Sequence, residues 1–116
     1  EGLLHLEDYF ILPKPADSSE PSWFGFAITI NDTSLFSRET LVNYLAGKLI
    51  DTRPLFAGNI TKQPYFKNVN YKTSKNLNNT NKIMSNSFWL GIYPYITTEM
   101  LDYVIKSFDD FINNYK

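Results

Sequence analysis

The stretch SFWLGIYPYITTEMLDYVIKSFDDFINNY, residues 87–115, places a β-strand directly before a long amphipathic helix. Aromatic and aliphatic residues dominate its first eight positions, up to Pro94, which is typical of a strand that ends there. Thr97 or Thr98 is the expected N-cap of the helix, and Glu99 suits the positive end of the helix dipole. Together the two patterns predict a helix that packs against a sheet.

Apolar side chains in the second half of this stretch recur three and four residues apart, with Asp102, Lys106 and Asp109 between them. This spacing puts the apolar side chains on one face of the helix, and we expect that face to be buried. The members of the expected buried face are Leu101, Val104, Ile105, Phe108, Phe111, Ile112 and Tyr115.

Upstream of this stretch, strand and helix patterns alternate. The run WFGFAITI from Trp23 has the alternation of a strand, and a shorter strand is predicted over 51–57. Helical spacing appears over 38–48 and again from about Leu77. The order strand, helix, strand, helix, strand, helix predicts an α+β fold. We expect a two-layer sandwich in which helices cover one face of a small, mostly antiparallel sheet of three or four strands.

The helix predicted over 38–48 has a clear beginning. Ser37 is its expected N-cap, and Glu39 follows in the first turn, where a negative charge is favourable. Three leucines spaced four residues apart predict one buried stripe along this helix. The members of the stripe are Leu41, Leu45 and Leu49.

Composition narrows the classes of function. A chain of 116 residues with 43% hydrophobic and 20% charged residues is long enough to fold as one domain. Its net charge of -1 argues against the broad basic surface that non-specific nucleic-acid binding requires. No apolar run approaches the ~20 residues of a membrane-spanning helix. We therefore expect no nucleic-acid partner and no membrane association.

Residues that commonly carry catalysis or bind metals are scarce. The sequence contains no cysteine and one histidine, His5. This excludes disulfides, thiolate nucleophiles and cysteine-ligated clusters or zinc within the chain, and a single histidine cannot form a metal site alone. No glycine-rich phosphate loop, GxSxG or HExxH motif is present. We expect no catalytic residue and no metal site in this chain, and we interpret His5 as a surface or packing residue.

The segment TRPLFAGNITKQPYF, residues 52–66, combines large rings, an arginine and a Gly-Asn turn without regular periodicity. Arg53 can bind a phosphate or carboxylate through two hydrogen bonds, or it can pair with Asp51 on the surface. Phe56 suits a pocket wall and the edge of a core equally. Asn59 can direct its amide toward a ligand or only complete a turn.

Two residues outside this segment are further candidates. Phe24 lies at the start of a predicted strand, where a ring can stack on a planar ligand, although most strand aromatics are core residues. Lys82 directly precedes Ile83 and Met84 and can reach toward the strand SFWLG, although a solvated lysine is the simpler interpretation.

Four segments resemble the C-terminal small domain of fold-type I pyridoxal-phosphate enzymes: PSWFGFAITI, TRPLFAGNITKQPYF, NNTNKIMSNSFWLGIYP and ITTEMLDYVIKSFDDF. Within the DegT-type aminotransferase superfamily, they resemble the CDP-4-keto-6-deoxyglucose 3-dehydrase group of lipopolysaccharide biosynthesis. The resemblance covers residues from about Pro21 to Phe111. It implies a connecting segment over 1–20, a small domain over 21–116, and a large cofactor-binding domain outside this chain.

The resemblance implies a full-length enzyme that removes the C3 hydroxyl group of a nucleotide-linked 4-keto-6-deoxyhexose. Pyridoxamine or pyridoxal phosphate (PMP or PLP) and a 2Fe-2S cluster would serve that enzyme, both bound by the large domain, and a reductase would supply electrons. The chain itself would bind no cofactor and would be inactive alone. The full enzyme is expected to be a cytoplasmic homodimer whose small domain contacts its own large domain and the nucleotide-sugar substrate.

The resemblance also implies which residues bind substrate. Carried onto this sequence, Phe24, Arg53, Phe56 and Asn59 lie at the active-site face. Lys82, in the string NTNKIM, matches a position where related sequences tend to carry arginine. Lysine keeps the positive charge but loses the planar donor fork of arginine.

Two alternatives remain open. A PLP-dependent sugar aminotransferase would have a similar small domain, but its large domain would carry a Schiff-base lysine and no cluster cysteines, where the dehydrase would carry a histidine. A non-catalytic sugar-binding module, from a different class, would have no upstream large domain. The upstream coding sequence would separate all three interpretations.

Overall fold

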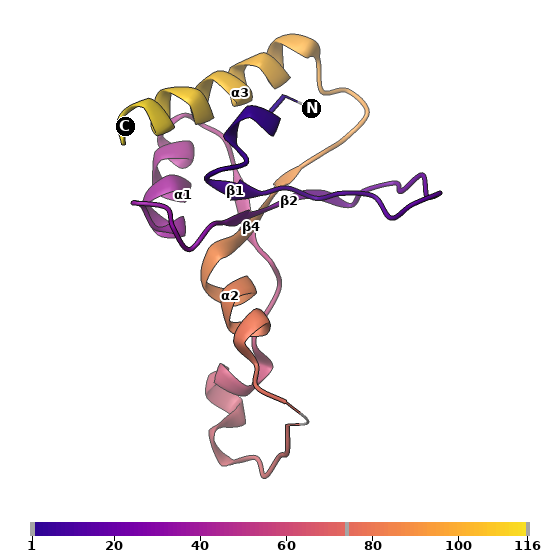
Figure 1. Ribbon diagram of the computed structural model, residues 1–116, viewed down its shortest axis with the longest axis vertical. Helices are drawn as coiled ribbons and strands as arrows, with labels where there is room; N and C mark the ends of the chain where they lie inside the picture. Colours follow the sequence, from indigo (N-terminus) through magenta and orange to yellow (C-terminus); the bar gives the residue numbers. More distant parts are fainter. Residues whose placement is uncertain (1, 74, 116) are drawn as a thin grey trace.

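The computed structural model describes residues 2–73 and 75–115, which form a four-stranded antiparallel sheet with two helices packed on one face (Figure 1). The strands are β1 (Phe10–Ile11), β2 (Gly25–Ile30), β3 (Thr52–Pro54) and β4 (Ser87–Gly91), in the order β1-β2-β4-β3. The helices are α1 (Arg38–Gly47), α2 (Asn78–Asn86) and α3 (Thr98–Asn113), with short 3₁₀ helices at Leu4–Leu6, Ile60–Lys62 and Pro64–Asn68. The predicted α+β class is confirmed.

The central strands β2 and β4 separate the core from the opposite face of the sheet. Side chains alternate between the two faces of a strand, so each strand contributes to both. The core side chains of these strands are Ile28, Ile30, Phe88 and Leu90. Ala27 and Trp89 are paired across the strands, and they lie between core residues. Their side chains therefore point to the opposite face.

Helices α1 and α3 complete the core from one side of the sheet. α1 contributes two of its predicted stripe residues, and α3 contributes three residues of its predicted buried face. The fully or nearly fully buried apolar side chains of these helices are Leu41, Leu45, Phe108, Phe111 and Ile112. Burying five such side chains stabilises the fold by roughly 1.5–3 kcal/mol each before entropy is counted.

Both predicted helix N-caps are confirmed. The Ser37 hydroxyl accepts a hydrogen bond from the Thr40 N–H at 3.1 Å, and the Thr97 hydroxyl accepts one from the Met100 N–H at 3.3 Å. The carboxylate of Glu99 accepts a hydrogen bond from the Glu99 backbone N–H, and this bond lowers the pKa of Glu99 below its usual value. A hydrogen bond with the Thr97 side chain lowers it further. These contacts fix where α1 and α3 begin.

The predicted burial of Leu49 is wrong, because α1 ends at Gly47 in a Schellman motif. The Ile50 N–H donates to the Leu45 carbonyl at 2.9 Å, and the Leu49 N–H donates to Ala46 at 3.0 Å. Leu49 takes a left-handed φ of 60° and its side chain is 95% exposed. Ile50 packs against the core in its place.

Two further differences from the sequence prediction have physical causes. Leu101 is about half exposed, because a groove separates the first turns of α3 from the sheet, and burial along α3 begins only at Val104. The strand predicted over 51–57 ends at Pro54, which has no N–H to donate to the ladder.

The N-terminal residues pack on the same core. Leu3, Leu6 and Phe10 are buried in it. His5 lies on the surface, as predicted, and its Nε2 is 2.6 Å from Oδ1 of Asp109 on α3. This segment is therefore held against α3 by apolar packing and by one polar contact.

The loop that follows β3 extends away from the sheet and makes the molecule elongated, 50 × 36 × 24 Å (Figure 1). Gly58 has a left-handed φ of 62°, and a Cβ there would lie 2.6 Å from Cβ and Cγ of Met84. The loop backbone thus packs directly on α2. Among the described residues, no helix has the length and apolar character needed to cross a membrane.

We predict that Gly58→Ala lowers the free energy of unfolding by about 1–3 kcal/mol, because the methyl group strains the backbone and collides with Met84. Urea unfolding followed by circular dichroism measures the change. Gly47→Ala is the matched control, since nothing lies within 4 Å of a Cβ at that helical position. The control should be neutral or stabilising by up to about 1 kcal/mol. Equal stability of the two variants would contradict the packing of the loop on α2.

Candidate functional site

Three aromatic side chains gather on the sheet face opposite α1 and α3. The ring centroid of Phe24 lies 4.8 Å from that of Trp89, and the ring of Phe56 lies 6.4 Å from it. The side chains of Phe24 and Phe56 are each 76% exposed. We call Phe24, Phe56 and Trp89 the ring cluster. Solvent-exposed rings in contact with one another form an apolar surface that is open to a flat ligand.

Trp89 is held in place from both sides. Its indole N–H donates a hydrogen bond to the Pro54 carbonyl at 3.1 Å. The indole also lies directly over Gly25, where a Cβ would come within 1.7 Å of the ring atom Cε3. At Gly91, the cross-strand partner of Gly25, a Cβ would meet nothing within 4 Å. Glycine is therefore required at position 25 by the ring, and not by the sheet.

Arg53 lies beside the ring cluster. It is the cross-strand partner of Trp89, so the two side chains share one face of the sheet. Its Nη2 is 3.2 Å from Oδ2 of Asp51, and both side chains are largely exposed. Exposed ion pairs contribute little free energy, so the guanidinium can exchange this partner for a phosphate or carboxylate.

Phe56 is presented by a strained turn. Its φ is 50°, in the left-handed region, which costs a residue with a side chain about 1–2 kcal/mol. The turn is closed by a hydrogen bond from the Phe56 N–H to the Pro54 carbonyl at 2.8 Å. A strained backbone persists only where the surrounding structure holds it, and such residues cluster at ligand-binding and active sites. The result is a ring directed outward beside Trp89.

Asn59 has a different environment, with only 2% of its surface exposed. Its Oδ1 accepts hydrogen bonds from the Thr61 N–H at 3.0 Å and from the Thr61 hydroxyl at 2.8 Å. Its Nδ2 donates to Oδ1 of Asn81 on α2 at 2.8 Å. In this geometry the amide fixes the loop to α2, and contact of Asn59 with a substrate stays a prediction.

Lys82 is also engaged within the chain. Its Nζ donates to Oδ2 of Asp32 at 2.7 Å, and Nδ2 of Asn86 donates to Oδ1 of the same carboxylate at 3.2 Å. These contacts tie α2 to the turn after β2. Anion binding by Lys82 stays a prediction.

The structure thus brings together Phe24, Arg53 and Phe56 and adds Trp89, which the sequence reasoning did not select. The available signal was Gly25 between large rings, because a glycine inside a strand often marks a close approach by another group. Within residues 2–73 and 75–115, no three His, Asp or Glu side chains gather to bind a metal ion. This arrangement combines exposed rings, which can stack on a planar or apolar group, with a guanidinium that can bind an anion.

Two curated relatives resemble nearly the whole chain. It is 49% identical over 111 residues to the lipopolysaccharide biosynthesis protein RfbH of Salmonella typhimurium, an alignment that covers 96% of this chain and 25% of that protein. It is 46% identical over 112 residues to the dTDP-4-dehydro-2,6-dideoxy-D-glucose 3-dehydratase of Saccharopolyspora spinosa, covering 97% and 24%. The chain therefore spans about a quarter of the length of these relatives.

Solved structures share the fold. The Escherichia coli GDP-4-keto-6-deoxy-D-mannose-3-dehydratase with bound hydrated PLP superposes with a TM-score of 0.76 at 27% identity, over 91% of this chain and 28% of that one. A DegT DnrJ EryC1 StrS aminotransferase from Brucella abortus has the same fold, with a TM-score of 0.75 at 17% identity over 95% and 28% of the two chains.

A protein family also matches nearly the whole chain. The DegT/DnrJ/EryC1/StrS aminotransferase family matches residues 1–109. The resemblance deduced from the four sequence segments is therefore confirmed at the level of the superfamily. The chain belongs to the DegT/DnrJ/EryC1/StrS aminotransferase family.

Proposed function

We propose that this chain is the C-terminal small domain, residues 21–116 with a connecting segment over 1–20, of a longer PLP- or PMP-dependent sugar-nucleotide 3-dehydratase. That enzyme removes the C3 hydroxyl group of a nucleotide-linked 4-keto-6-deoxyhexose, in the synthesis of lipopolysaccharide sugars. The observation that carries the proposal is the 46–49% identity, across almost the whole chain, to a named 3-dehydratase and to a lipopolysaccharide biosynthesis protein.

The ring cluster and Arg53 give this domain its part in the reaction. A nucleotide-sugar has a planar base, an apolar sugar face and a diphosphate. The exposed rings of Phe24 and Phe56 suit the flat or apolar parts, and the weakly paired guanidinium of Arg53 suits the phosphates. The domain binds and orients the substrate, and it excludes water from one side of the site.

We place the main binding sites of both prosthetic groups outside this chain. A 2Fe-2S cluster needs thiolate ligands, and the sequence has no cysteine. PLP supplies an electron sink next to the reacting carbon, and Lys82, a candidate for anion binding, is engaged by Asp32. Both groups would be bound by the remaining part of the enzyme.

The wider setting of the proposed enzyme follows from its chemistry. If a cluster delivers electrons one at a time, a reductase must supply them, so a reductase partner is part of the proposal. We further propose that the full enzyme is a homodimer. We place it in the cytoplasm, where it would act on nucleotide-sugars made in the same compartment.

An aminotransferase is the second candidate, because the family is named for that activity and the Brucella abortus protein carries the same name. The two reactions use the same cofactor and a similar sugar. They differ in whether the product loses the C3 hydroxyl group or gains an amino group.

The deciding experiment incubates the purified longer protein with PMP, a reductant and CDP-, dTDP- or GDP-4-keto-6-deoxyhexose. We expect mass spectrometry to detect a 3-deoxy product. Incubation with PLP and glutamate tests the alternative, and accumulation of an aminosugar there, with no 3-deoxy product in the first reaction, would replace the dehydratase assignment by an aminotransferase.

We predict that Arg53→Gln in the longer protein raises KM for the nucleotide-sugar about tenfold to a hundredfold. The loss corresponds to one charge-assisted contact of about 1.5–3 kcal/mol. Asp51→Asn is the control, because it removes the same ion pair and leaves the guanidinium in place. An equal rise in KM for both variants would mean that Arg53 acts through its pair with Asp51 and not on the substrate.

We predict that Gly25→Ala displaces the Trp89 indole, changes the tryptophan fluorescence spectrum and raises KM severalfold, because the added methyl group overlaps the ring. Gly91→Ala tests the same strand pair without this overlap and should change neither. Unchanged fluorescence in Gly25→Ala would show that the indole does not rest on this glycine in solution.

A further inference from the structure

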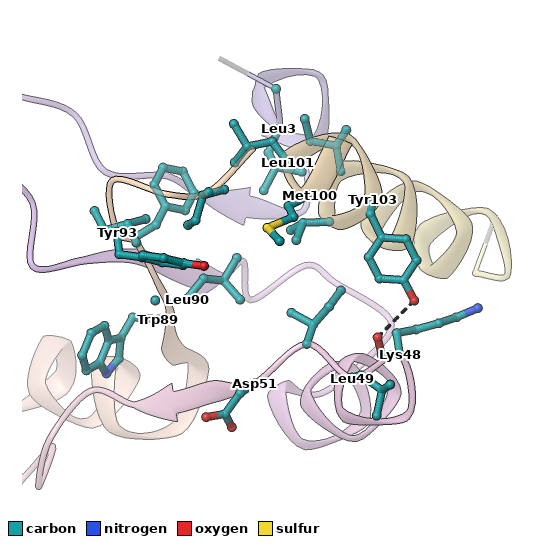
Figure 2. A pocket seen from close by; sticks show the side chains of 18 of the residues that line it. Leu3, Lys48, Leu49, Asp51, Trp89, Leu90, Tyr93, Met100, Leu101 and Tyr103 are labelled. Atoms are coloured by element: carbon teal, nitrogen blue, oxygen red, sulfur yellow. Dashed lines mark hydrogen bonds between the residues drawn. The ribbon is translucent and has the colours of Figure 1, made fainter. Parts of the chain in front are cut away.

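A second apolar feature lies between α3 and the sheet, and its lining extends to Arg53 and Trp89 of the candidate site. Figure 2 shows a groove between the first turns of α3 and the sheet. The volume of this groove is about 1030 Å³. We call it the α3 groove. Leu90 lies at its floor, side chains of α3 line one wall, and the residues just after α1 line the other. The apolar and aromatic side chains of its lining include Leu3, Leu49, Tyr93, Met100, Leu101 and Tyr103.

The walls of the α3 groove are unusually exposed for apolar side chains. Leu49 is almost fully exposed, and Tyr93, Met100, Leu101 and Tyr103 are each about half exposed. Isolated exposed apolar residues are normal on a protein surface, whereas large contiguous patches mark binding surfaces. One end of the groove is closed by a hydrogen bond from the Tyr103 hydroxyl to the Lys48 carbonyl at 3.0 Å (Figure 2).

Leu49 adds an energetic argument. It occupies the left-handed position of the Schellman motif, where glycine is preferred and a side chain costs about 1 kcal/mol or more. The leucine side chain recovers none of this cost within the described chain, because it is 95% exposed. A strained and exposed leucine at the wall of an apolar groove is explained if the groove is covered in the longer protein.

The N-terminal end of the chain indicates the covering segment. Gly2 and Leu3 themselves line the groove, and the N-terminal segment, drawn in indigo, lies beside α3 (Figure 1). The contact is close, because a Cβ at Gly2 would lie 2.2 Å from Cδ1 of Ile105. The described chain therefore begins in the groove, and any polypeptide that precedes residue 1 in a longer protein is joined to it close by. Its covalent connection gives it a high effective concentration there, which a second copy of the chain lacks.

We infer that the α3 groove is covered by polypeptide that precedes residue 1 in the longer protein and packs apolar side chains against Leu49 and Leu101. The inference rests on the proposed function in one respect, that a longer protein exists; the curated relatives are about four times as long as this chain. β4 links the groove to the ring cluster, since its Leu90 lines the groove and its Trp89 belongs to the ring cluster.

Thiol labelling tests this inference, because this chain has no cysteine of its own and peptide mass spectrometry separates an introduced thiol from any cysteine elsewhere in the longer protein. Leu49→Cys introduces a thiol at the groove, and Leu35→Cys introduces one at an exposed position that does not line it. Labelling with a maleimide is followed by peptide mass spectrometry. We expect similar rates for both variants in the 116-residue chain, and at least tenfold slower labelling of Leu49→Cys, but not of Leu35→Cys, in the longer protein.

Two results would overturn the inference. One is equally fast labelling of both variants in the longer protein. The other is labelling of Leu49→Cys in the 116-residue chain that slows as protein concentration rises, which would mean that a second copy fills the groove. The readout does not depend on catalysis, so a longer protein that protects position 49 but removes no hydroxyl group refutes the proposed function alone.

Leu49→Gly gives an independent readout with opposite expected signs. In the 116-residue chain it should raise the urea midpoint, because it relieves the left-handed strain and loses no burial. In the longer protein it should lower the midpoint, because a buried leucine is lost. A raised midpoint in both proteins would contradict the inference.

Discussion

The pairing of β4 with β2 is the interaction on which the remaining structure depends. β4 is also paired with β3, so it joins the two halves of the sheet and is central to it. Its alternating side chains do two tasks: Phe88 and Leu90 fill the core under α1 and α3, while Trp89 organises the opposite face. A register shift of one residue would exchange these faces and remove the core and the ring cluster together.

The candidate site is assembled from distant parts of the sequence by this pairing. Phe24 precedes β2, Arg53 lies on β3, Phe56 follows it, and Trp89 is on β4. The loop that carries Phe56 is fixed to α2 by Asn59 and Gly58, both of which contact that helix. Gly58 and Asn59 thus hold the loop in shape, and Phe56 is the loop residue that is exposed beside Trp89.

Features governed by neighbouring residues were predictable from the sequence. The caps Ser37 and Thr97, the buried face of α3 from Val104 onward and the α+β order all follow from local spacing. Leu49 was mispredicted because the helix ends with a leucine in a position that usually holds glycine, so no residue signalled the end. Trp89 was missed because its role depends on which residue lies across the strand pair. The internal partners of Asn59 and Lys82 likewise come from segments 22 and 50 residues away in the sequence.

The contact between Trp89 and Gly25 has a consequence for how this surface can change during evolution. One large ring occupies the space of two side chains, so the sizes at positions 25 and 89 are coupled. Any residue larger than glycine at position 25 becomes acceptable only after the indole has been replaced by something smaller. Homologous sequences with a larger residue at position 25 should therefore have a smaller residue at position 89. Such a sequence also lacks the flat surface that the Trp89 indole provides.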